Sequence, residues 1–373
     1  MNVAVVLVAA GNGERLGAGI PKALVRVAGK TLLAHSLSAI AQFKPAQLVV
    51  VAHEDHVAEF ADLVSANYPL AYEIVPGGLT RQGSVANGLS KVTQELVLVH
   101  DAARCFATQA LFHTVAQELE NSECVIPALA VTDTIKEVSG DRVVATLDRN
   151  LLRAAQTPQG FVTEKLRQAL ASVSEDFTDE AALMATSGYN VNWIAGEVSA
   201  NKITTPQDLA TANALHGKKR TGIGTDAHRY SDSGSLVLGC LEWPELPKLD
   251  GHSDGDSIAH AIVDALLSAA GLGDIGSNFG VDRPEYSGAS GEIFLAATLE
   301  LLARNGYGVE NVAVQVIADQ PKIGPRRAEL EQRLSSLVGA SVSVGATTTD
   351  GLGFLSDSRG VAAVATALLQ GRG

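Results

Sequence analysis

Two groups of residues in this sequence have the types and spacing needed for chemistry on phosphates. In the first, a glycine-rich turn from Gly11 to Gly17 directly follows an apolar run, and Arg15 and Lys22 lie in and just after it. Glycines let backbone N–H groups approach a phosphate, and a helix that starts there favours negative charge. Two nearby cations suit a triphosphate and the charge that gathers during phosphoryl transfer; alternatively, both are solvated surface cations. The turn fits neither the GxGxxG fingerprint nor a P-loop.

Other polar residues follow the ends of further expected strands and face the same expected crevice. The turn at Gly78 carries Arg81 and Ser84, and Asp101 ends the run ELVLVHD. A carboxylate at a strand end can hold Mg²⁺ on phosphates; alternatively, Asp101 caps a helix and Arg104 is its surface partner. Short polar motifs later in this half are each more typical of structure than of function when taken singly; they contain Thr134, Arg149 and Lys202.

The second group has the composition of a metal site. Asp226 and His228 are two apart in an expected strand, so their side chains point to the same side. His260 lies in an expected helix, where a lone histidine is more typical of a satisfied core residue. Two histidines and one carboxylate leave one position open, which fits catalytic zinc, with non-haem iron the less favoured alternative. Asp264, one helical turn after His260, is expected to accept a hydrogen bond from that ring.

Polar loops accompany this second group. His252 to Asp256 precede the expected helix, and Asp256 either belongs to the site or is simply the helix N-cap. Asp274 lies in a tight GDIG turn that suits ribose hydroxyls. The hydroxyls and the acid in the run TTTDG, residues 347–351, suit a diphosphate with Mg²⁺; alternatively, this run is only a threonine-rich strand end.

The elements that must position these residues differ between the two halves. Up to residue 215, short apolar runs at 3–10, 48–53, 95–103 and 124–131 alternate with helical patterns. That rhythm predicts an α/β domain with a doubly wound, mostly parallel sheet, whose ligands lie beyond the carboxyl ends of its strands. A basic linker is expected at 216–220. Residues 221–373 predict a smaller α+β unit that ends with a strand at 341–348 and a helix at 361–370.

The composition limits the classes of function. The 373-residue chain has 28 Lys and Arg against 41 Asp and Glu, a net charge of −13, which argues against binding nucleic acid or an anionic membrane. Small anionic substrates remain compatible, because a few local cations and amides hold a phosphate. Three cysteines without a CxxC pair exclude a disulfide framework and favour a reducing, cytoplasmic setting. No run reaches about 18 apolar residues, so no membrane span is expected.

Seven ordered motifs over the first 210 or so residues resemble the 2-C-methyl-D-erythritol 4-phosphate cytidylyltransferase family. They are VVLVAAGNGERLGAGIPK, GGLTRQGSV, VHDAAR, DTIK, DRN…TPQGF, TDEA and NKITTPQDL. The resemblance implies transfer of a cytidylyl group from CTP to a sugar-alcohol phosphate, with release of pyrophosphate, and a dimer arm at EVSGDRVVATLD. The implied roles are catalysis for Arg15 and Lys22, substrate binding for Gly11, Gly78, Ser84, Thr134, Arg149 and Lys202, and Mg²⁺ binding for Asp101.

Residues 221–373 resemble the 2-C-methyl-D-erythritol 2,4-cyclodiphosphate synthase family through GIGTDAHRY, LDGHSDGDSIAHAIVDALLSAAGLGDIG, DQPKIGP and TTTDGLGF. The resemblance implies a trimer with active sites between subunits, where a 2-phosphate attacks the β-phosphate of a cytidine diphosphate and CMP leaves. The implied roles are Zn²⁺ binding for Asp226, His228 and His260, Mg²⁺ binding for Asp350, catalysis for His252 and Thr348, and substrate binding for Ser253, Asp274, Ile275, Gly276, Lys322, Thr347, Thr349, Asp350 and Phe354.

Together the two resemblances predict a bifunctional enzyme of non-mevalonate isoprenoid-precursor synthesis, whose dimer and trimer contacts are compatible with a hexamer. One departure leaves an alternative open. Asp357 stands where the second family has an arginine, and loss of a phosphate-directed cation costs orders of magnitude in rate. Either Arg359 or Arg283 replaces it, or the second half is a zinc-containing assembly domain with weak or no cyclase activity. A nucleotidyltransferase fused to an unrelated metal hydrolase would require the motif order to be accidental.

Overall fold

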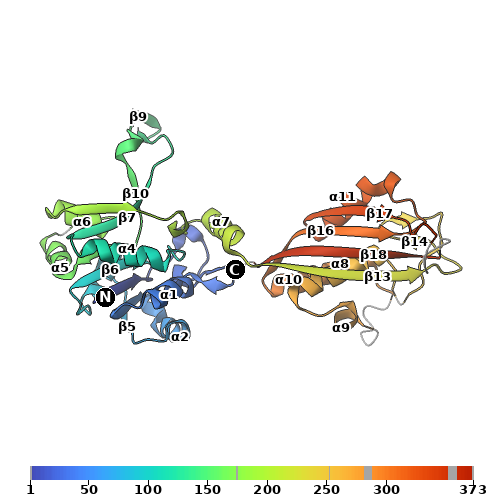
Figure 1. Cartoon of the computed structure of the whole chain (residues 1–373), viewed down its shortest axis with the longest axis horizontal. Coiled ribbons are helices and arrows are strands. Elements are labelled where there is room, and N and C mark those ends of the chain that lie inside the picture. Colours follow the sequence, from blue (N-terminus) through green and yellow to red (C-terminus); the bar gives the residue numbers. More distant parts are fainter. Residues whose placement is uncertain (1, 174, 252, 281–287, 352–358, 372–373) are drawn as a thin grey trace. The chain divides into compact units, whose positions relative to one another are not determined.

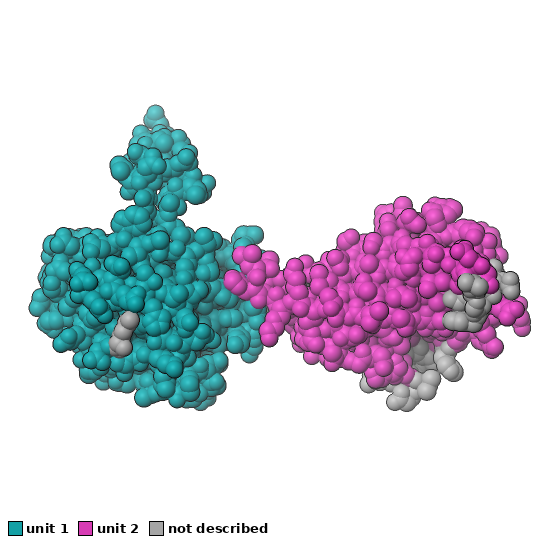
Figure 2. All heavy atoms as spheres, viewed as in Figure 1, with its two compact units in different colours: residues 1–212 teal, residues 213–373 magenta. Residues whose placement is uncertain are grey.

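The chain forms two compact units, residues 1–212 and 213–373, which Figure 2 shows in different colours. The computed structural model describes residues 2–173, 175–251, 253–280, 288–351 and 359–371. Among these, no helix is long and apolar enough to cross a membrane. The sequence-predicted residues His252, Arg283, Phe354 and Asp357 lie outside the described residues.

The first unit is built on an eight-stranded sheet with the order β10-β7-β11-β6-β1-β4-β5, in which β12 also pairs with β7. Strands β1, β4, β5 and β6 run parallel to one another, and β11 joins β6 antiparallel. The strands are β1 (Val3–Val8), β4 (Gln47–Ala52), β5 (Glu73–Pro76), β6 (Leu96–Asp101), β7 (Cys124–Ala130), β10 (Arg153–Ala155), β11 (Gln159–Val162) and β12 (Val191–Ala195).

Helices cover both faces of this sheet. Val5 and Leu7 of β1 share a core with α1, α2 and α4, whereas Ala4 and Val6 share another core with α3, α5 and α6. A strand buried on both faces needs an unbroken apolar sequence, which explains the run VAVVLV. The predicted doubly wound fold is therefore confirmed. The helices are α1 (Leu32–Phe43), α2 (Val57–Asn67), α3 (Arg81–Leu89), α4 (Gln109–Leu119), α5 (Thr163–Ser172), α6 (Glu180–Thr186) and α7 (Pro206–His216).

A hairpin of β8 (Lys136–Ser139) and β9 (Arg142–Thr146) projects away from this unit (Figure 1). It coincides with the segment that resembles a dimer arm. Its valines Val138, Val143 and Val144 are 61%, 61% and 56% exposed in the single chain. Apolar side chains on a protruding hairpin favour a partner surface over solvent.

The second unit packs helices against a four-stranded sheet of order β13-β18-β16-β17. Strands β13 and β16 pair antiparallel with β18, and β17 pairs parallel with β16. Strands β13, β16 and β17 therefore run in the same direction, and their carboxyl ends lie at the same edge of the sheet. The main elements are β13 (Lys219–Arg229), α8 (Ser257–Ala270), α9 (Ile275–Phe279), α10 (Gly291–Arg304), β16 (Tyr307–Ile317), α11 (Arg327–Val338), β17 (Ser341–Thr347) and β18 (Gly360–Gly371).

The expectation of a helix at 361–370 is wrong, because this segment is strand β18, paired with β13 on one side and β16 on the other. The alanines of this segment have a high helix propensity, which favoured a helix. Small side chains are, however, also required where a strand packs closely against α8. A Cβ on Gly224 of the neighbouring strand would lie 2.2 Å from the carbonyl oxygen of Ala261 in α8. Tertiary packing therefore overrides local propensity here. Lys219 and Arg220, expected in the linker, pair with β18.

Candidate functional site

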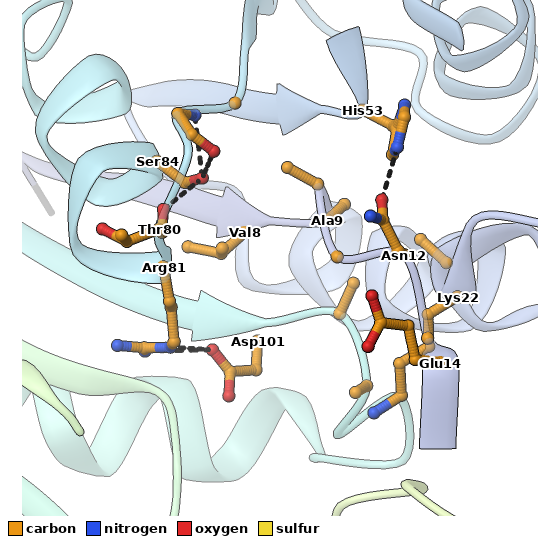
Figure 3. Close-up of a pocket in the computed structure, with 18 of the residues that line it drawn as sticks. Val8, Ala9, Asn12, Glu14, Lys22, His53, Thr80, Arg81, Ser84 and Asp101 are labelled. Carbon is orange, nitrogen blue, oxygen red and sulfur yellow. Dashed lines mark hydrogen bonds and ion pairs between the residues drawn. The ribbon is translucent and has the colours of Figure 1, made fainter. Parts of the chain in front are cut away.

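A cavity of about 730 Å³ lies beyond the carboxyl ends of β1, β4, β5 and β6 in the first unit (Figure 3). It brings together residues from six separate stretches of the chain, with Thr80, Arg81 and His53 among its other lining residues. The sequence-predicted residues that line it are Gly11, Arg15, Lys22, Gly78, Ser84, Asp101 and Lys202. Thr134 and Arg149 are not among its lining residues; the Arg149 guanidinium donates to the Thr132 carbonyl oxygen at 2.6 Å.

The glycine-rich turn is shaped so that Lys22 folds back over it. Gly13 has φ +72°, and a Cβ on Gly13 would lie 2.9 Å from the Lys22 Cβ, so a side chain there would collide with the lysine. The Lys22 backbone N–H donates to the Gly11 carbonyl oxygen at 3.0 Å. Within the turn, Glu14–Leu16 form a short 3₁₀ segment between Gly13 and Gly17, where the sequence predicted the start of a helix. Backbone amides and a cation thus gather at one point.

The second glycine turn is fixed by Ser84. The Gly78 N–H donates to Ser84 Oγ at 3.0 Å, and Ser84 Oγ donates to the Thr80 carbonyl oxygen at 2.9 Å. A Cβ on Gly78 would lie 2.8 Å from the Gly83 carbonyl carbon, so only glycine fits. Leu79, at the tip of this turn, is fully exposed.

Asp101 is the centre of a buried charge network. Arg81 Nε donates to Asp101 Oδ1 at 3.0 Å, and Lys202 Nζ donates to Asp101 Oδ2 at 2.7 Å. The same Arg81 binds both carboxylate oxygens of Glu180 at 2.8 Å. Burial opposes ionisation of Asp101, but Arg81 and Lys202 outweigh it and hold the pKa of this carboxyl well below its ordinary range. Asp101 is therefore a permanent anion between two cations.

The alternative in which Asp101 is a helix cap with Arg104 as its surface partner is wrong. Asp101 ends β6 and is 7% exposed, and its backbone N–H donates to Thr157 Oγ1 at 3.1 Å. The Arg104 guanidinium instead donates to the carbonyl oxygens of Ala155 and Ala200. Arg104 therefore joins the end of β10 to the short 3₁₀ segment Val198–Ala200.

Replacing Glu180 by alanine is expected to destabilise the first unit by about 3 kcal/mol, because it removes one partner of a buried ion pair. Glu180 is 2% exposed and burial raises its pKa, which the Arg81 guanidinium partly opposes. Thermal unfolding of the full chain measures the loss. The matched control, Glu164→Ala, removes an exposed acid 3.7 Å from Arg167 and should change stability by less than about 0.5 kcal/mol. Equal effects of the two substitutions would contradict this assignment.

Lys22 titrates in an unusual range. Burial, together with the nearby Lys202 and Arg15, lowers its pKa to about 8, against the opposing attraction of Asp101. A bound triphosphate favours the charged form and raises that pKa. Affinity for CTP should therefore be highest below pH 8 and fall as the pH rises through 8, where binding must take up a proton.

Calorimetric titration of CTP at pH 8 to 9, in buffers of different ionisation enthalpy, measures this proton uptake. The Lys22→Arg variant keeps its charge throughout this range and should show no uptake. The assignment would be contradicted if the variant took up the same number of protons as the native chain.

In the second unit, Asp226, His228 and His260 form the predicted cluster. Asp226 Oδ2 lies 2.7 Å from His228 Nδ1 and 3.3 Å from His260 Nδ1, and one donor atom of each residue lies within 4.8 Å of the others. In a tetrahedral zinc site the ligand atoms are about 3.3 Å apart. Burial opposes ionisation of Asp226, but the two imidazoles outweigh it and keep its pKa well below the ordinary value. The donor set and its spacing fit a divalent metal with an open position.

The expected hydrogen bond between His260 and Asp264 is wrong. Asp264 Oδ1 accepts the Ile275 N–H at 2.7 Å, at the start of α9. The second ring nitrogen of His260, Nε2, instead faces Ser253 Oγ at 3.2 Å, with Asp254 Oδ1 at 3.9 Å. Ser253 and Asp254 lie in the loop before α8, so the spacing of residues along the helix could not predict these contacts.

The remaining predicted residues take varied places. Asp256 is the N-cap of α8 and accepts the Ile258 and Ala259 N–H groups, as one of the two interpretations held. Asp274 caps α9. The Thr348 hydroxyl donates to Asp350 Oδ1 at 2.9 Å in the turn after β17. That turn lies at the same edge of the sheet as His228. Because β17 and β13 are three strand spacings apart, the turn is about 14 Å from His228. Lys322 is exposed.

Comparison with known proteins identifies the family of each unit. Residues 3–218 match the family described as 2-C-methyl-D-erythritol 4-phosphate cytidylyltransferase (IspD), and residues 219–370 match the YgbB family. A bifunctional enzyme IspD/IspF of Clavibacter michiganensis is 50% identical over 384 residues, which cover 98% of this chain and 94% of that protein. Its counterpart in Tropheryma whipplei is 37% identical, with both chains covered at 100%.

Solved structures show the same relationship. The bifunctional IspDF of Campylobacter jejuni is 27% identical, with a TM-score of 0.50 over 100% of this chain and 99% of that chain. The 4-diphosphocytidyl-2C-methyl-D-erythritol synthase of Anaerococcus prevotii is 28% identical, with a TM-score of 0.51 over 57% of this chain and 97% of that one.

Fold and sites define a two-part enzyme of phosphate chemistry, a nucleotidyltransferase joined to a metal-dependent unit. The chain belongs to the bifunctional IspD/IspF family. It is thus a cytidylyltransferase and a cyclodiphosphate synthase of isoprenoid-precursor synthesis, acting on CTP and small phosphorylated substrates.

Proposed function

We propose that the cavity of the first unit binds CTP and 2-C-methyl-D-erythritol 4-phosphate side by side. The observation that carries this proposal is the convergence of Arg15, Lys22 and Lys202 with two glycine turns in one cavity. Gly11, Gly78 and Ser84 hold the cytidine, and the amides of the first turn hold the phosphates. The full chain should release pyrophosphate only when both substrates are present; release from CTP alone at the same rate would contradict this pairing.

In the proposed reaction, a phosphate oxygen of the sugar-alcohol phosphate attacks the α-phosphorus of CTP, and the bond to the β-phosphate oxygen breaks. Pyrophosphate leaves, so no covalent enzyme intermediate is needed. Arg15 and Lys22 stabilise the negative charge on the α-phosphate, and the cavity holds the two substrates in line. Lys202 holds the attacking phosphate, together with Thr134 and Arg149. Because these last two are not among the residues that line the cavity of their own chain, we assign them to the site of a second copy.

Asp101 is the proposed Mg²⁺ ligand of the first unit. Mg²⁺ prefers hard oxygen ligands such as carboxylates, and the carboxylate of Asp101 is permanently ionised. Mg²⁺ would supply charge neutralisation on the CTP phosphates. The ion would compete with Lys202 for Oδ2, which frees the lysine for the sugar phosphate.

In the second unit we propose that Asp226, His228 and His260 hold Zn²⁺, with Asp350 on Mg²⁺. The zinc would supply a Lewis acid beside the diphosphate. His252 and Thr348 position the phosphates, while Asp274, Ile275 and Gly276 hold hydroxyls. The other proposed substrate contacts are Ser253, Lys322, Thr347, Thr349 and Phe354. Arg359 lines a second cavity with His228 and Arg229, and it is the proposed replacement for the family arginine.

The competing function for this unit is a zinc-containing assembly domain with weak or no cyclase activity. The substitution at Asp357 favours it. The cluster of Asp226, His228 and His260 opposes it, because an assembly role does not require a metal position left open for substrate. Cyclase turnover separates the two functions directly.

We propose that the second unit forms a trimer through the sheet face that lies opposite α8. Ile223 is 60% exposed there and pairs in register with the exposed Thr366, which in turn pairs with the exposed Ala313 of β16. With arm contacts between first units, trimers would join into a hexamer. We also propose a cytoplasmic location, which suits an acidic chain that acts on small phosphorylated substrates.

Sedimentation of the native chain should give the mass of three or six copies, and Thr366→Glu should lower it, because a charge would be buried at the interface. The control, Thr211→Glu on the exposed side of α7, should leave the mass unchanged. A native mass of one or two chains would contradict the trimer.

We also place the domain boundary at residues 216–220, between the two activities.

A further inference from the structure

His53 is a cavity residue to which the proposed reaction gives no role. It directly follows β4, its side chain is only 16% exposed, and it lines the cavity beside the first glycine turn (Figure 3). Three strand ends meet at this point, because the Ala9 N–H donates to the Val51 carbonyl oxygen and the Gly77 N–H donates to the Ala52 carbonyl oxygen.

The hydrogen bonds of His53 fix its ring and the proton on it. Nδ1 accepts the Asp55 N–H at 3.2 Å, so the proton of the neutral ring lies on Nε2. Nε2–H then donates to Asn12 Oδ1 at 2.5 Å. The imidazole is therefore a rigid link between the end of β4 and the side chain of Asn12.

Asn12 is the residue through which this link acts on the turn. It stands between Gly11 and Gly13, and Gly13 has φ +72°. Glycines on both sides give the turn freedom that binding must remove at an entropic cost. A hydrogen bond that holds the intervening side chain reduces that freedom before the ligand arrives.

We propose that His53 is a positioning residue for the nucleotide: by holding Asn12, it preorganises the Gly11–Gly13 amides that bind the phosphates of CTP. This inference rests on the proposed binding of CTP in the cavity. Its consequence is specific to one substrate. Loss of the link weakens the binding of CTP. Binding of the sugar-alcohol phosphate, which is held by Lys202, is unaffected.

His53→Ala should raise the KM for CTP by about 3- to 10-fold, with kcat changed less than about twofold and the KM for the second substrate unchanged. His53→Gln should restore the KM, because its amide can donate to Asn12 Oδ1. The matched control is His56→Ala: this ring contacts His53 at 5.3 Å but binds Glu59 and is not a lining residue. An unchanged kcat for cytidylyl transfer at saturating substrates shows that the first unit of each variant is intact.

A double-mutant cycle separates this positioning role from a general structural one. If His53 acts through Asn12, the effect of His53→Ala on the KM for CTP should vanish in an Asn12→Ala background. Additive effects, equal rises in both KM values, or a KM for CTP equal to that of the native chain would overturn the inference. If the native chain released no pyrophosphate from CTP and 2-C-methyl-D-erythritol 4-phosphate together, the proposed function itself would fail instead.

Discussion

Lys22→Met should lower kcat for cytidylyl transfer by about 10²- to 10³-fold, the usual cost of removing one group aimed at a transition-state charge. Lys22 folds back over the glycine turn because its backbone N–H is held by the Gly11 carbonyl oxygen. Its ammonium group shares the cavity with Arg15, Asp101 and Lys202. Single-turnover release of pyrophosphate from CTP in the presence of 2-C-methyl-D-erythritol 4-phosphate measures the chemical step without interference from product release.

The same protein contains the control for this prediction. Cyclase turnover of the Lys22→Met chain should equal that of the native chain, since the residue belongs to the other unit. Lys91→Met, which removes an exposed lysine away from the cavity, should leave both activities unchanged. If Lys22→Met raised KM but left kcat intact, the lysine would bind the substrate equally in the ground state and the transition state, and its specific assignment to the transition state would be wrong.

His228→Ala should abolish stoichiometric binding of the divalent metal by the second unit and lower cyclase turnover by about 10³-fold or more, because the Lewis acid is lost with it. Asp226 Oδ2 faces both imidazoles, so removing one ring leaves two donors where a catalytic zinc site has three protein ligands. Elemental analysis of the purified chain and CMP release measure the two effects. Cytidylyl transfer should stay at the native rate.

Asp264→Asn is the matched control on α8. This acid lies one turn after His260, but its carboxylate accepts the Ile275 N–H, a bond that an asparagine oxygen can keep. The variant should retain its metal. Loss of the metal from Asp264→Asn, or its retention in His228→Ala, would contradict the ligand set.

Local signals in the sequence predicted much of the fold and of both sites. The glycine turn, Arg15 and Lys22 stand within 14 residues of the end of β1, so one strand-to-loop connection determines their placement. Asp226 and His228 share one strand face for the same reason. Where function depends on such short-range geometry, residue types and spacing are enough to predict it.

Long-range contacts are what the sequence could not supply. Arg81 joins Asp101 and Glu180, which stand 20 and 99 residues away from it, and no periodicity relates them. The link from His53 to Asn12 spans 41 residues, and its only signal was a histidine at a strand end. Likewise, β18 is a strand because two partners and α8 enclose it, although its alanines favour a helix locally.

The central claim, that one chain carries two working active sites, is tested most directly by the second reaction. Purified protein is given 4-diphosphocytidyl-2-C-methyl-D-erythritol 2-phosphate with Mg²⁺ and Zn²⁺, and CMP and the cyclic diphosphate are followed together. We expect equal amounts of the two products, loss of both on chelation and their return when metal is restored. A chain that transfers cytidylyl groups at full rate but forms no metal-dependent CMP would contradict the claim and leave the second unit an assembly domain.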